Sequence, residues 1–264
     1  MKQNQQYYRD MAKVENVVIP DAEKLPYLAR EAINILRGNI QLSGYDLKTI
    51  AITSTYANEG KSSISFWLAK SMASLKKKTL YLDCDIRNSI TVSRYNIQQK
   101  LIGLSEFLCG QAALLDVIYR TDDEYFDMIF TGALAPNPSE LLSSRLFGKM
   151  MDYLRGKYDY VIVDVPPLLP VIDGTLVAKQ CDGTIMVVEC SETDRNEAIK
   201  AKRQLEYAGI HVLGAVLNKV GAKGHHYGYG YGKYGYGRYG KYGKYGYGYG
   251  YGKYGKDLDE DSDE

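Results

Sequence analysis

Short apolar runs alternate with segments of helical periodicity along most of the chain. Apolar residues recur at helical spacing from Glu23 to Gln41, and this pattern ends near Gly44. Further helices are expected from about Gly60 to Lys76, from Pro138 onward after the capping residue Asn137, and from about Asp194 to Tyr207. The runs that predict strands are Lys48–Thr53, Thr79–Leu82, Met128–Phe130, Tyr158–Val163, Thr184–Val188 and Val212–Leu217.

This order of elements predicts the fold class. Strands that alternate with helices indicate a mostly parallel sheet with helices on both faces, which is an α/β domain. We expect that domain to span about residues 22–221, after a flexible polar N-terminus over residues 1–21. Over residues 222–264 the composition changes to Gly, Tyr and basic residues with an acidic end, which predicts a disordered tail.

The loop after the first predicted strand contains Gly60-Lys61-Ser62. Gly-Lys-Ser at a helix start is the core of a phosphate-binding loop, where backbone N–H groups and the helix N-terminus surround phosphates. Lys61 adds a positive charge, and Ser62 is placed to ligate Mg²⁺. An ordinary turn is the alternative, and Thr55 replaces the first glycine of the usual pattern. The strand–loop–helix context favours a P-loop NTPase-like domain that binds a nucleotide.

Aspartates follow two of the predicted strands. Asp83 and Asp85 come at the end of the second strand, and Asp164 closes the run that begins at Tyr158. Carboxylates at the carboxyl ends of parallel strands open onto the ligand crevice. One is needed for the Mg²⁺ shell, and another can accept a proton from an attacking hydroxyl. A single such aspartate indicates only a solvated turn, but three at the edge that holds Lys61 predict a catalytic site.

The tail concentrates tyrosine. Of 25 tyrosines in the chain, nearly half lie in this segment, and each of these is followed by glycine. Alternating glycine leaves no continuous apolar face, so packing in a core does not explain the aromatics. We interpret their phenols as phosphoryl acceptors; the alternative is a self-associating low-complexity segment. The predicted acceptors are Tyr227, Tyr229, Tyr231, Tyr234, Tyr236, Tyr239, Tyr242, Tyr245, Tyr247, Tyr249, Tyr251 and Tyr254.

Overall composition excludes several classes of protein. A formal net charge of +1 gives no nucleic-acid-binding signature, so no nucleic-acid partner is expected. The 4 cysteines form no C-x-x-C pair and have no partnered histidines, so the sequence supports neither a zinc site nor a redox dithiol. The N-terminus has no apolar signal-peptide core, and no apolar run approaches the ~20 residues of a membrane span. We therefore expect a cytoplasmic protein.

Several longer stretches carry a family resemblance. The most specific are residues 59–63, 83–87, 103–110, 136–144 and 158–167. In these stretches the chain resembles a bacterial tyrosine kinase of capsular and exopolysaccharide biosynthesis, in its separate cytoplasmic form. The similarity runs from about Leu25 to Asn218 and resumes in the tyrosine-rich tail.

The resemblance implies an ATP- and Mg²⁺-dependent kinase that phosphorylates its own tyrosine cluster and regulates polysaccharide synthesis and export. By resemblance, Lys61 and Ser62 belong to the Walker A motif, and Asp164 is the Walker B aspartate. Asp83 and Asp85 form a second acidic motif, in which Asp83 is our candidate proton acceptor. Ser62, Asp85 and Asp164 are expected to hold Mg²⁺. The predicted nucleotide-binding residues are Asn58, Glu59, Gly60, Lys61, Ser62, Ser63 and Asn218.

The resemblance also implies partners. Such kinases are activated by the cytosolic segment of a membrane-embedded polysaccharide co-polymerase, which recruits them to the inner face of the membrane, and a tyrosine phosphatase opposes them. They form homo-oligomeric rings through an N-terminal E-x-x-R-x-x-R helix. Here Asn34 replaces the first arginine between Glu31 and Arg37, which removes a charge and a forked donor. The resemblance thus predicts a homo-oligomer, but not a ring built from the usual contacts.

Two other classes remain as alternatives. One is a positioning or partitioning ATPase of the MinD and ParA type, which acts as a switch without kinase activity. Those proteins carry a second lysine five positions before the invariant one, where this chain has Tyr56. The other is a scaffold whose tail only mediates association, which would require inert acidic sites. The absent loop lysine and the tyrosine-rich tail both favour the kinase.

Overall fold

The computed structural model describes residues 16–17, 25–44, 46–88, 91–94, 97 and 101–221. The predicted tail, including its twelve tyrosines and its acidic end, lies outside these residues. Among the helices of the described ranges, none combines the length and apolar character needed to cross a membrane.

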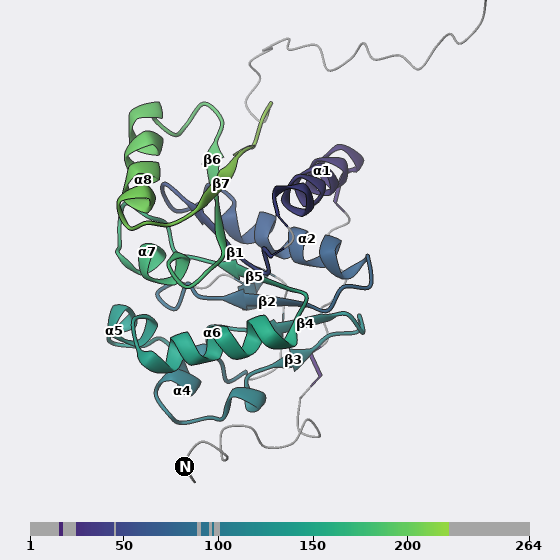
Figure 1. Cartoon of the computed structure of the whole chain (residues 1–264), viewed down its shortest axis with the longest axis vertical. Helices are drawn as coiled ribbons and strands as arrows, with labels where there is room; N and C mark the ends of the chain where they lie inside the picture. Colours follow the sequence, from purple (N-terminus) through teal and green to yellow (C-terminus); the bar gives the residue numbers. More distant parts are fainter. Residues whose placement is uncertain are drawn as a thin grey trace, which may run out of the picture. The chain divides into compact units, whose positions relative to one another are not determined.

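A seven-stranded sheet forms the centre of the domain, in the order β3-β4-β2-β5-β1-β6-β7 (Figure 1). All neighbouring strands are parallel except β3 and β4, which are antiparallel. This confirms the predicted mostly parallel α/β sheet. The strands are β1 (Thr49–Ser54), β2 (Thr79–Asp83), β3 (Tyr119–Arg120), β4 (Phe126–Ile129), β5 (Tyr160–Asp164), β6 (Gly183–Glu189) and β7 (Val212–Asn218).

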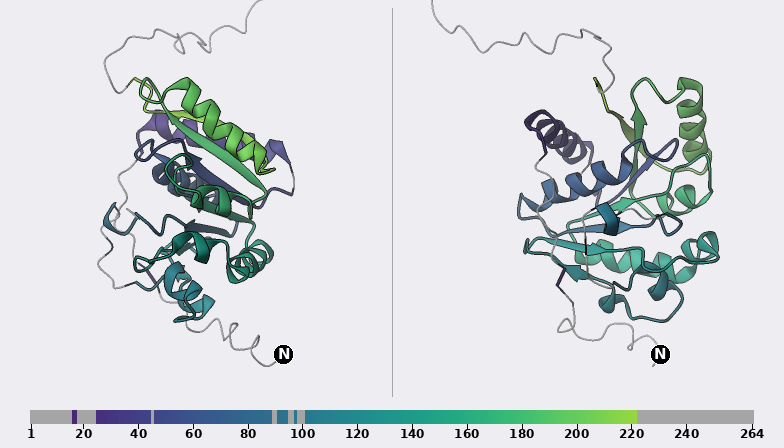
Figure 2. Two further views of the ribbon diagram at one scale, coloured as in Figure 1. Left: turned by 90° about the vertical axis from the view of Figure 1, so that its left-hand side faces the viewer. Right: turned by 180° about the vertical axis from the view of Figure 1, so that it is seen from behind.

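Helices lie on both faces of the sheet (Figures 1 and 2). Helix α2 packs on β1, β2 and β5, and α1 packs on α2. Helices α4 to α8 contribute to the core on the opposite face. The helices are α1 (Tyr27–Ser43), α2 (Lys61–Ala73), α3 (Thr91–Arg94), α4 (Leu104–Leu108), α5 (Pro138–Leu142), α6 (Arg145–Lys157), α7 (Asp173–Ala178) and α8 (Arg195–Tyr207), with a 3-10 turn over Leu114–Asp116.

Each face of the sheet has its own hydrophobic core. Because successive side chains of a strand point to opposite faces, neighbouring residues of β1 and β2 enter different cores. Tyr81 of β2 packs toward α2, whereas Leu80 and Leu82 pack toward the opposite helical layer. All residues of β1 and β2 are buried, since helices cover both faces. This double burial explains why these strands are continuous apolar runs in the sequence.

The N-terminal prediction is wrong for two residues. We expected residues 1–21 to be flexible, but Asn16 forms a bridge with Arg120 of β3, and the Val17 amide donates to the Arg120 carbonyl at 2.8 Å. Val17 is only 1% exposed because it packs into the core on the α2 side. Val17 begins a run of three apolar residues with Val18 and Ile19, which is too short to show a helical or strand period.

The helix predicted from Pro138 begins there but is short. Helix α5 ends at Leu142, and α6 begins after Ser144, whose hydroxyl accepts from the Phe147 amide at 3.2 Å. The predicted cap also differs, because the Asn137 amide donates to the Glu140 carboxylate at 2.8 Å and makes no hydrogen bond to the helix backbone. The sequence therefore contains two successive helix starts where we expected one.

The sheet order brings the acidic residues to one edge. Strand β5 lies between β2 and β1, and Asp164 of β5 is in register with Asp83 of β2 and with Ile52 of β1. The three strands are parallel, so their carboxyl ends open on the same side as the loop that follows β1. This edge is the location predicted for the catalytic residues.

Candidate active site

The loop between β1 and α2 has the backbone shape of a phosphate cradle. Gly60 precedes the helix with a φ of 99°, and a Cβ at this position would lie 2.1 Å from the Asn218 amide nitrogen. Only glycine fits both the left-handed backbone and this close approach. Helix α2 begins at Lys61, so its unpaired N–H groups face the space in front of the loop.

Glu59 holds the loop from inside the protein. Its side chain is buried, and one carboxylate oxygen accepts from the Thr55 amide at 2.7 Å. The other oxygen accepts from the hydroxyl of Thr193, in the turn after β6. We predicted Glu59 among the nucleotide-binding residues, and the structure directs its side chain to the protein. Its contribution to binding is therefore the shape of the loop.

The end of β7 supports the loop from the other side. The Asn218 amide donates to the Glu59 carbonyl at 2.9 Å, and the Lys219 ammonium donates to the Asn58 carbonyl at 2.8 Å. Lys219 also pairs with Glu189 at 2.8 Å. We predicted Asn218, but sequence analysis missed Lys219, although it is the next residue. Together these two side chains fix two successive carbonyl groups of the loop.

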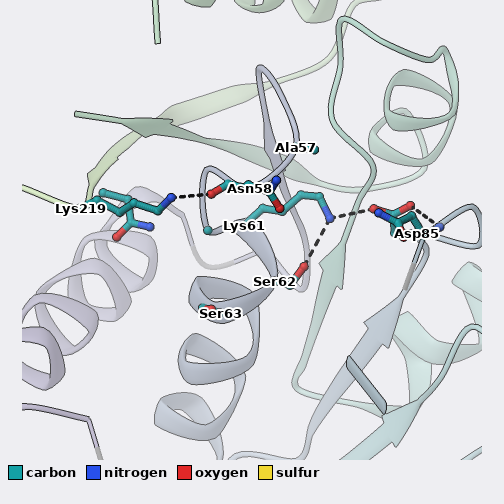
Figure 3. Close-up of a pocket in the computed structure, with 10 residues that line it drawn as sticks. Ala57, Asn58, Lys61, Ser62, Ser63, Asp85 and Lys219 are labelled. Atoms are coloured by element: carbon teal, nitrogen blue, oxygen red, sulfur yellow. Dashed lines mark hydrogen bonds and ion pairs between the residues drawn. The ribbon is translucent and has the colours of Figure 1, made fainter. Parts of the chain in front are cut away.

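The Lys61 side chain points to Asp85 (Figure 3). Its ammonium lies 2.9 Å from the Asp85 carboxylate and 3.6 Å from that of Asp164, and it contacts the Ser62 hydroxyl at 3.3 Å. The Lys61 side chain is 9% exposed and that of Asp164 is 1% exposed. The predicted residues Lys61, Ser62, Asp85 and Asp164 thus form one buried cluster.

Burial and charge oppose each other in this cluster. Burial alone lowers the pKa of Lys61, but the carboxylates of Asp164 and Asp85 more than offset it and raise that pKa. Burial raises the pKa of Asp164, an effect that Lys61 and hydrogen bonds from Ser62 and Tyr81 counteract only in part. Lys61 therefore remains a cation, and its charge stabilises the buried carboxylate of Asp164.

Asp83 is deeper than Asp85. One of its carboxylate oxygens accepts from the Thr91 hydroxyl at 2.6 Å, and the other accepts from the Asp85 amide at 3.1 Å. The Tyr81 hydroxyl lies 3.2 Å from that of Thr91 and donates to Asp164 at 3.1 Å. These contacts connect the two acidic motifs through buried hydroxyl groups. Among the three aspartates, only Asp85 lines the cavity in front of the loop.

An ion pair fixes the segment that follows Asp85. The Arg87 guanidinium binds the carboxylate of Asp173, which is fully buried at the start of α7. Arg87 also donates to the Ser139 hydroxyl at 3.1 Å, and that hydroxyl in turn donates to Asp173. Sequence analysis did not identify Asp173, because nothing in its surroundings signals a partner about 86 residues earlier in the chain.

A cavity of about 230 Å³ lies in front of the loop. Its walls are polar, with main-chain N–H groups at the helix start, two lysines, two serines and one aspartate, and this set suits phosphates with a bound Mg²⁺. Ser62 and Asp85 line it directly, while Asp164 lies behind Lys61. The lining residues are Ala57, Asn58, Gly60, Lys61, Ser62, Ser63, Asp85, Asn88, Asn218 and Lys219 (Figure 3).

Asn58 occupies a left-handed position in this loop, with a φ of 68°. Asparagine tolerates that conformation, glycine adopts it freely, and β-branched residues resist it. Asn58→Gly should therefore keep nucleotide affinity within about twofold, whereas Asn58→Val should weaken it by roughly tenfold or more through about 1–3 kcal/mol of backbone strain. Calorimetric titration of both variants measures this, and equal affinities would contradict a conformational role for Asn58.

The residues at the ring-motif positions, Glu31, Asn34 and Arg37, make contacts within this chain. Arg37 donates to the carbonyl and the hydroxyl of Ser71 in α2, each at 2.8 Å. The Ser71 hydroxyl donates to Asn34 at 3.1 Å, and Asn34 donates to Glu31 at 3.3 Å. These four side chains join α1 to α2.

Tyr56 contacts the protein at the position where positioning ATPases carry a second loop lysine. A hydrogen bond between its hydroxyl and Glu197 of α8 raises the pKa of Tyr56. A tyrosine at this position supplies no cation to the phosphate loop.

Comparisons with known proteins extend over this whole region. A family model described as an AAA domain matches residues 47–200, which include the loop and both acidic motifs. The chain is 41% identical over 217 residues to tyrosine-protein kinase CpsD of Streptococcus pneumoniae, covering 81% of this chain and 96% of the relative. It is 33% identical over 205 residues to tyrosine-protein kinase YwqD of Bacillus subtilis, covering 76% and 86%.

Solved structures agree with the sequence relatives. The kinase domain of the Escherichia coli tyrosine kinase ETK matches with a TM-score of 0.70 and 28% identity, over 81% of this chain and 94% of that chain. The septum site-determining protein MinD of Pyrococcus horikoshii, complexed with Mg-ADP, matches with a TM-score of 0.59 and 24% identity, over 67% and 72%. The second likeness is one of fold alone.

Proposed function

Because this chain belongs to the bacterial tyrosine kinases of capsule and exopolysaccharide synthesis, we propose that it transfers the γ-phosphoryl group of ATP to tyrosines of its own tail. The observation that carries this proposal is the position of Lys61. Its ammonium projects from a phosphate loop between two carboxylates, in front of which lies a polar cavity. Such a site combines the positive charge that phosphates need with acidic groups that can hold a metal ion or a proton.

The residues present suit a nucleotide with Mg²⁺. The amides at the start of α2 and the Lys61 ammonium would bind the phosphates, and Asn218 and Lys219 would shape the far end of the site. Ser62 would ligate Mg²⁺ directly, with Asp85 and Asp164 as direct or water-mediated partners. When bound, the metal neutralises charge on the transferred phosphoryl group.

In the transfer step, the phenolic oxygen of a tail tyrosine forms a bond to the γ-phosphorus. The bond from that phosphorus to the bridging oxygen breaks, and ADP leaves with the electron pair. The phenolic proton passes to a carboxylate. Asp83 is our candidate, and the Thr91 hydroxyl that donates to it is then part of the site, since it orients the accepting oxygen.

The acceptors are the twelve tyrosines between Tyr227 and Tyr254, each next to a glycine. They lie outside the described residues, so their support comes from the sequence and from the family. The chain continues into this segment directly after β7, whose end contacts the phosphate loop.

Further proposals concern partners and location. We place the protein in the cytoplasm, at the inner face of the membrane when bound to the cytosolic segment of a polysaccharide co-polymerase that activates it. A tyrosine phosphatase would reverse the modification. A homo-oligomer is expected, and the intramolecular contacts of Arg37 and Asn34 favour an arrangement other than the family's usual ring.

The direct test is to incubate purified protein with ATP and Mg²⁺, with and without the activator segment, and to map phosphotyrosine by mass spectrometry. Tail phosphotyrosine that depends on Mg²⁺ supports the kinase. ATP hydrolysis without phosphotyrosine under both conditions would favour the ATPase switch instead.

Phosphorylation between protomers is a separate prediction. About 33 residues separate Gly221 from Tyr254, and a Gly-rich coil of that length has a root-mean-square span of roughly 30 Å, so chain length alone permits transfer within one molecule. We expect transfer in trans. Inactive Lys61→Arg protein with an intact tail should become phosphorylated when mixed with active protein whose twelve tail tyrosines are phenylalanine. An unlabelled inactive chain after mixing would exclude transfer between protomers.

A further inference from the structure

A second cavity, of about 470 Å³, adjoins the phosphate site. It lies at the carboxyl ends of β2 and β4, between the segment that follows Asp85 and the segment that follows Ile129. Asn88 lines both cavities, so the two spaces meet at this residue. Most of the second wall is apolar, and the residues used below are Ile86, Asn88, Val92, Leu101, Phe130 and Leu134.

Several described residues of this cavity are packed or paired. Ile86 and Phe130 are almost fully buried, and the ion pair of Arg87 with Asp173 holds the segment between Ile86 and Asn88. Val92 and Leu101 pack against the core on the α2 side. Leu134, by contrast, is 80% exposed at the rim. The cavity therefore has a buried apolar floor and an exposed apolar edge, which is an unusual surface to leave open to water.

The cavity is apolar on most of its wall and polar toward the phosphate site. Arg87, Asn88 and Thr131 also line it, and Asn88, whose backbone N–H donates to Asp85, is shared with the phosphate site. In the first cavity, Lys219 lies at the opposite end from Asp85, with Lys61 between them (Figure 3). A side chain with an apolar body and a polar tip would fill the second cavity and direct its tip to the Asp85 end of the phosphate site.

We propose that this second cavity is the acceptor site, which binds the side chain of one tyrosine from the segment Tyr227–Tyr254 with its hydroxyl at the boundary marked by Asn88. The inference rests on the proposed function and specifies how the acceptor is recognised. A tyrosine has the required shape, and the glycine after each tail tyrosine adds no side chain that would meet Leu134 at the rim.

The length of the tail also fits this occupant. The described chain ends at Gly221, just after β7, a parallel strand that ends at the same sheet edge as β2 and β4. Tyr227 and Tyr254 follow at about 6 and 33 residues, which extended chain spans as about 20 Å and 110 Å. Several tyrosines can thus reach a site on this edge, and recognition of the ring with its glycine neighbour would let one cavity serve them all.

Variants of the full chain test the proposal. Val92→Trp fills the cavity and should lower the initial rate of tail phosphorylation at least about tenfold, while nucleotide affinity changes less than about twofold. Leu134→Ala shortens the rim and should raise the KM of an added Tyr-Gly peptide by roughly threefold. Leu75→Ala, an exposed leucine beyond the far end of α2, is the matched control and should change neither value.

Cross-linking gives a second readout that does not depend on a filled cavity. A photoreactive phenylalanine at position 236 of otherwise unaltered protein, with a non-hydrolysable ATP analogue bound, should cross-link to residues 86–92, 101 or 130–134. Cross-links only to other regions would overturn the proposal. The proposal would also be overturned if Val92→Trp lost nucleotide affinity while the nucleotide-bound fraction still labelled its tail at the normal rate. In that case the cavity would belong to the nucleotide. If unaltered protein forms no phosphotyrosine, the kinase proposal fails, and cross-linking still decides whether the cavity binds the tail.

Discussion

Lys61→Met should abolish tail phosphorylation and also lower the free energy of unfolding by about 3 kcal/mol or more. The sequence alone presents Lys61 as part of an exposed loop, from which its removal would leave the fold intact. The structure instead buries its ammonium against Asp85 and Asp164. Methionine leaves the buried Asp164 carboxylate without its counter-charge. Phosphotyrosine immunoblots measure the first effect, and urea unfolding measures the second.

The stability loss should depend on pH in a defined direction. Burial already raises the pKa of Asp164, and removing Lys61 takes away the charge that lowers it, so the pKa rises further in the variant. A carboxyl group whose folded pKa is above its unfolded value of about 3.9 favours the folded state as pH falls through the folded pKa. The difference in Tm between Lys61→Met and unaltered protein should thus be smaller at pH 5 than at pH 8.

Lys61→Arg is the matched control for these two effects. It keeps the charge but replaces a compact ammonium by a planar fork, so activity should fall while most of the stability is retained. If Lys61→Met labels its tail at the normal rate, the assigned ATP site is wrong. If it is as stable as Lys61→Arg at pH 8, the buried ion pairs do not stabilise the fold.

Asp83→Asn should reduce tyrosine transfer by about 10²-fold or more and leave nucleotide affinity nearly unchanged. The substitution keeps the shape of the side chain but removes the proton acceptor. Asp83 does not line the phosphate cavity, and the carboxylates within 4 Å of the Lys61 ammonium include those of Asp85 and Asp164. Asp164→Asn, in contrast, should also weaken Mg²⁺-dependent nucleotide binding, because Asp164 contacts Lys61 and Ser62.

Thr91→Val tests the orientation of the Asp83 carboxylate separately from its presence. It removes the hydroxyl that donates to Asp83 and leaves every carboxylate in place, so transfer should fall by less than in Asp83→Asn. Single-turnover rates and titrations with an ATP analogue measure transfer and binding separately. Equal losses of nucleotide affinity in Asp83→Asn and Asp164→Asn would remove the basis for giving the two residues different roles.

The sheet edge that carries the site could be predicted because its signals are local. An apolar run followed by Asp164, and a Gly-Lys-Ser start of α2, each identify a strand or helix and the residue at its end. Parallel pairing then brings those ends together. Residues that hold these groups from elsewhere could not be predicted in the same way, since the contacts of Asp173 with Arg87 and of Thr193 with Glu59 join residues 86 and 134 positions apart in the chain.

The sequence also could not predict that Asp83 and Asp85 are buried to different extents. Asp83 and Asp85 are separated by one residue, and both match the same motif. Their environments differ because Asp83 is the last residue of β2 and accepts a hydrogen bond from Thr91, whereas Asp85 lies in the following turn beside Lys61. Similarly, no pattern signals that Val17 adds to the core, since its run of three apolar residues is too short to show a period.

The end of β7 couples the proposed acceptor segment to the proposed nucleotide site. Asn218 and Lys219 hold two carbonyls of the phosphate loop, and the covalent chain passes from them into the tyrosine-rich tail. A partner that binds the tail and displaces the end of β7 must therefore alter nucleotide affinity. Linkage is reciprocal, so ATP and ADP must alter the affinity of that partner by the same factors. The affinity of that partner for the tail would then depend on whether ATP or ADP is bound at the loop.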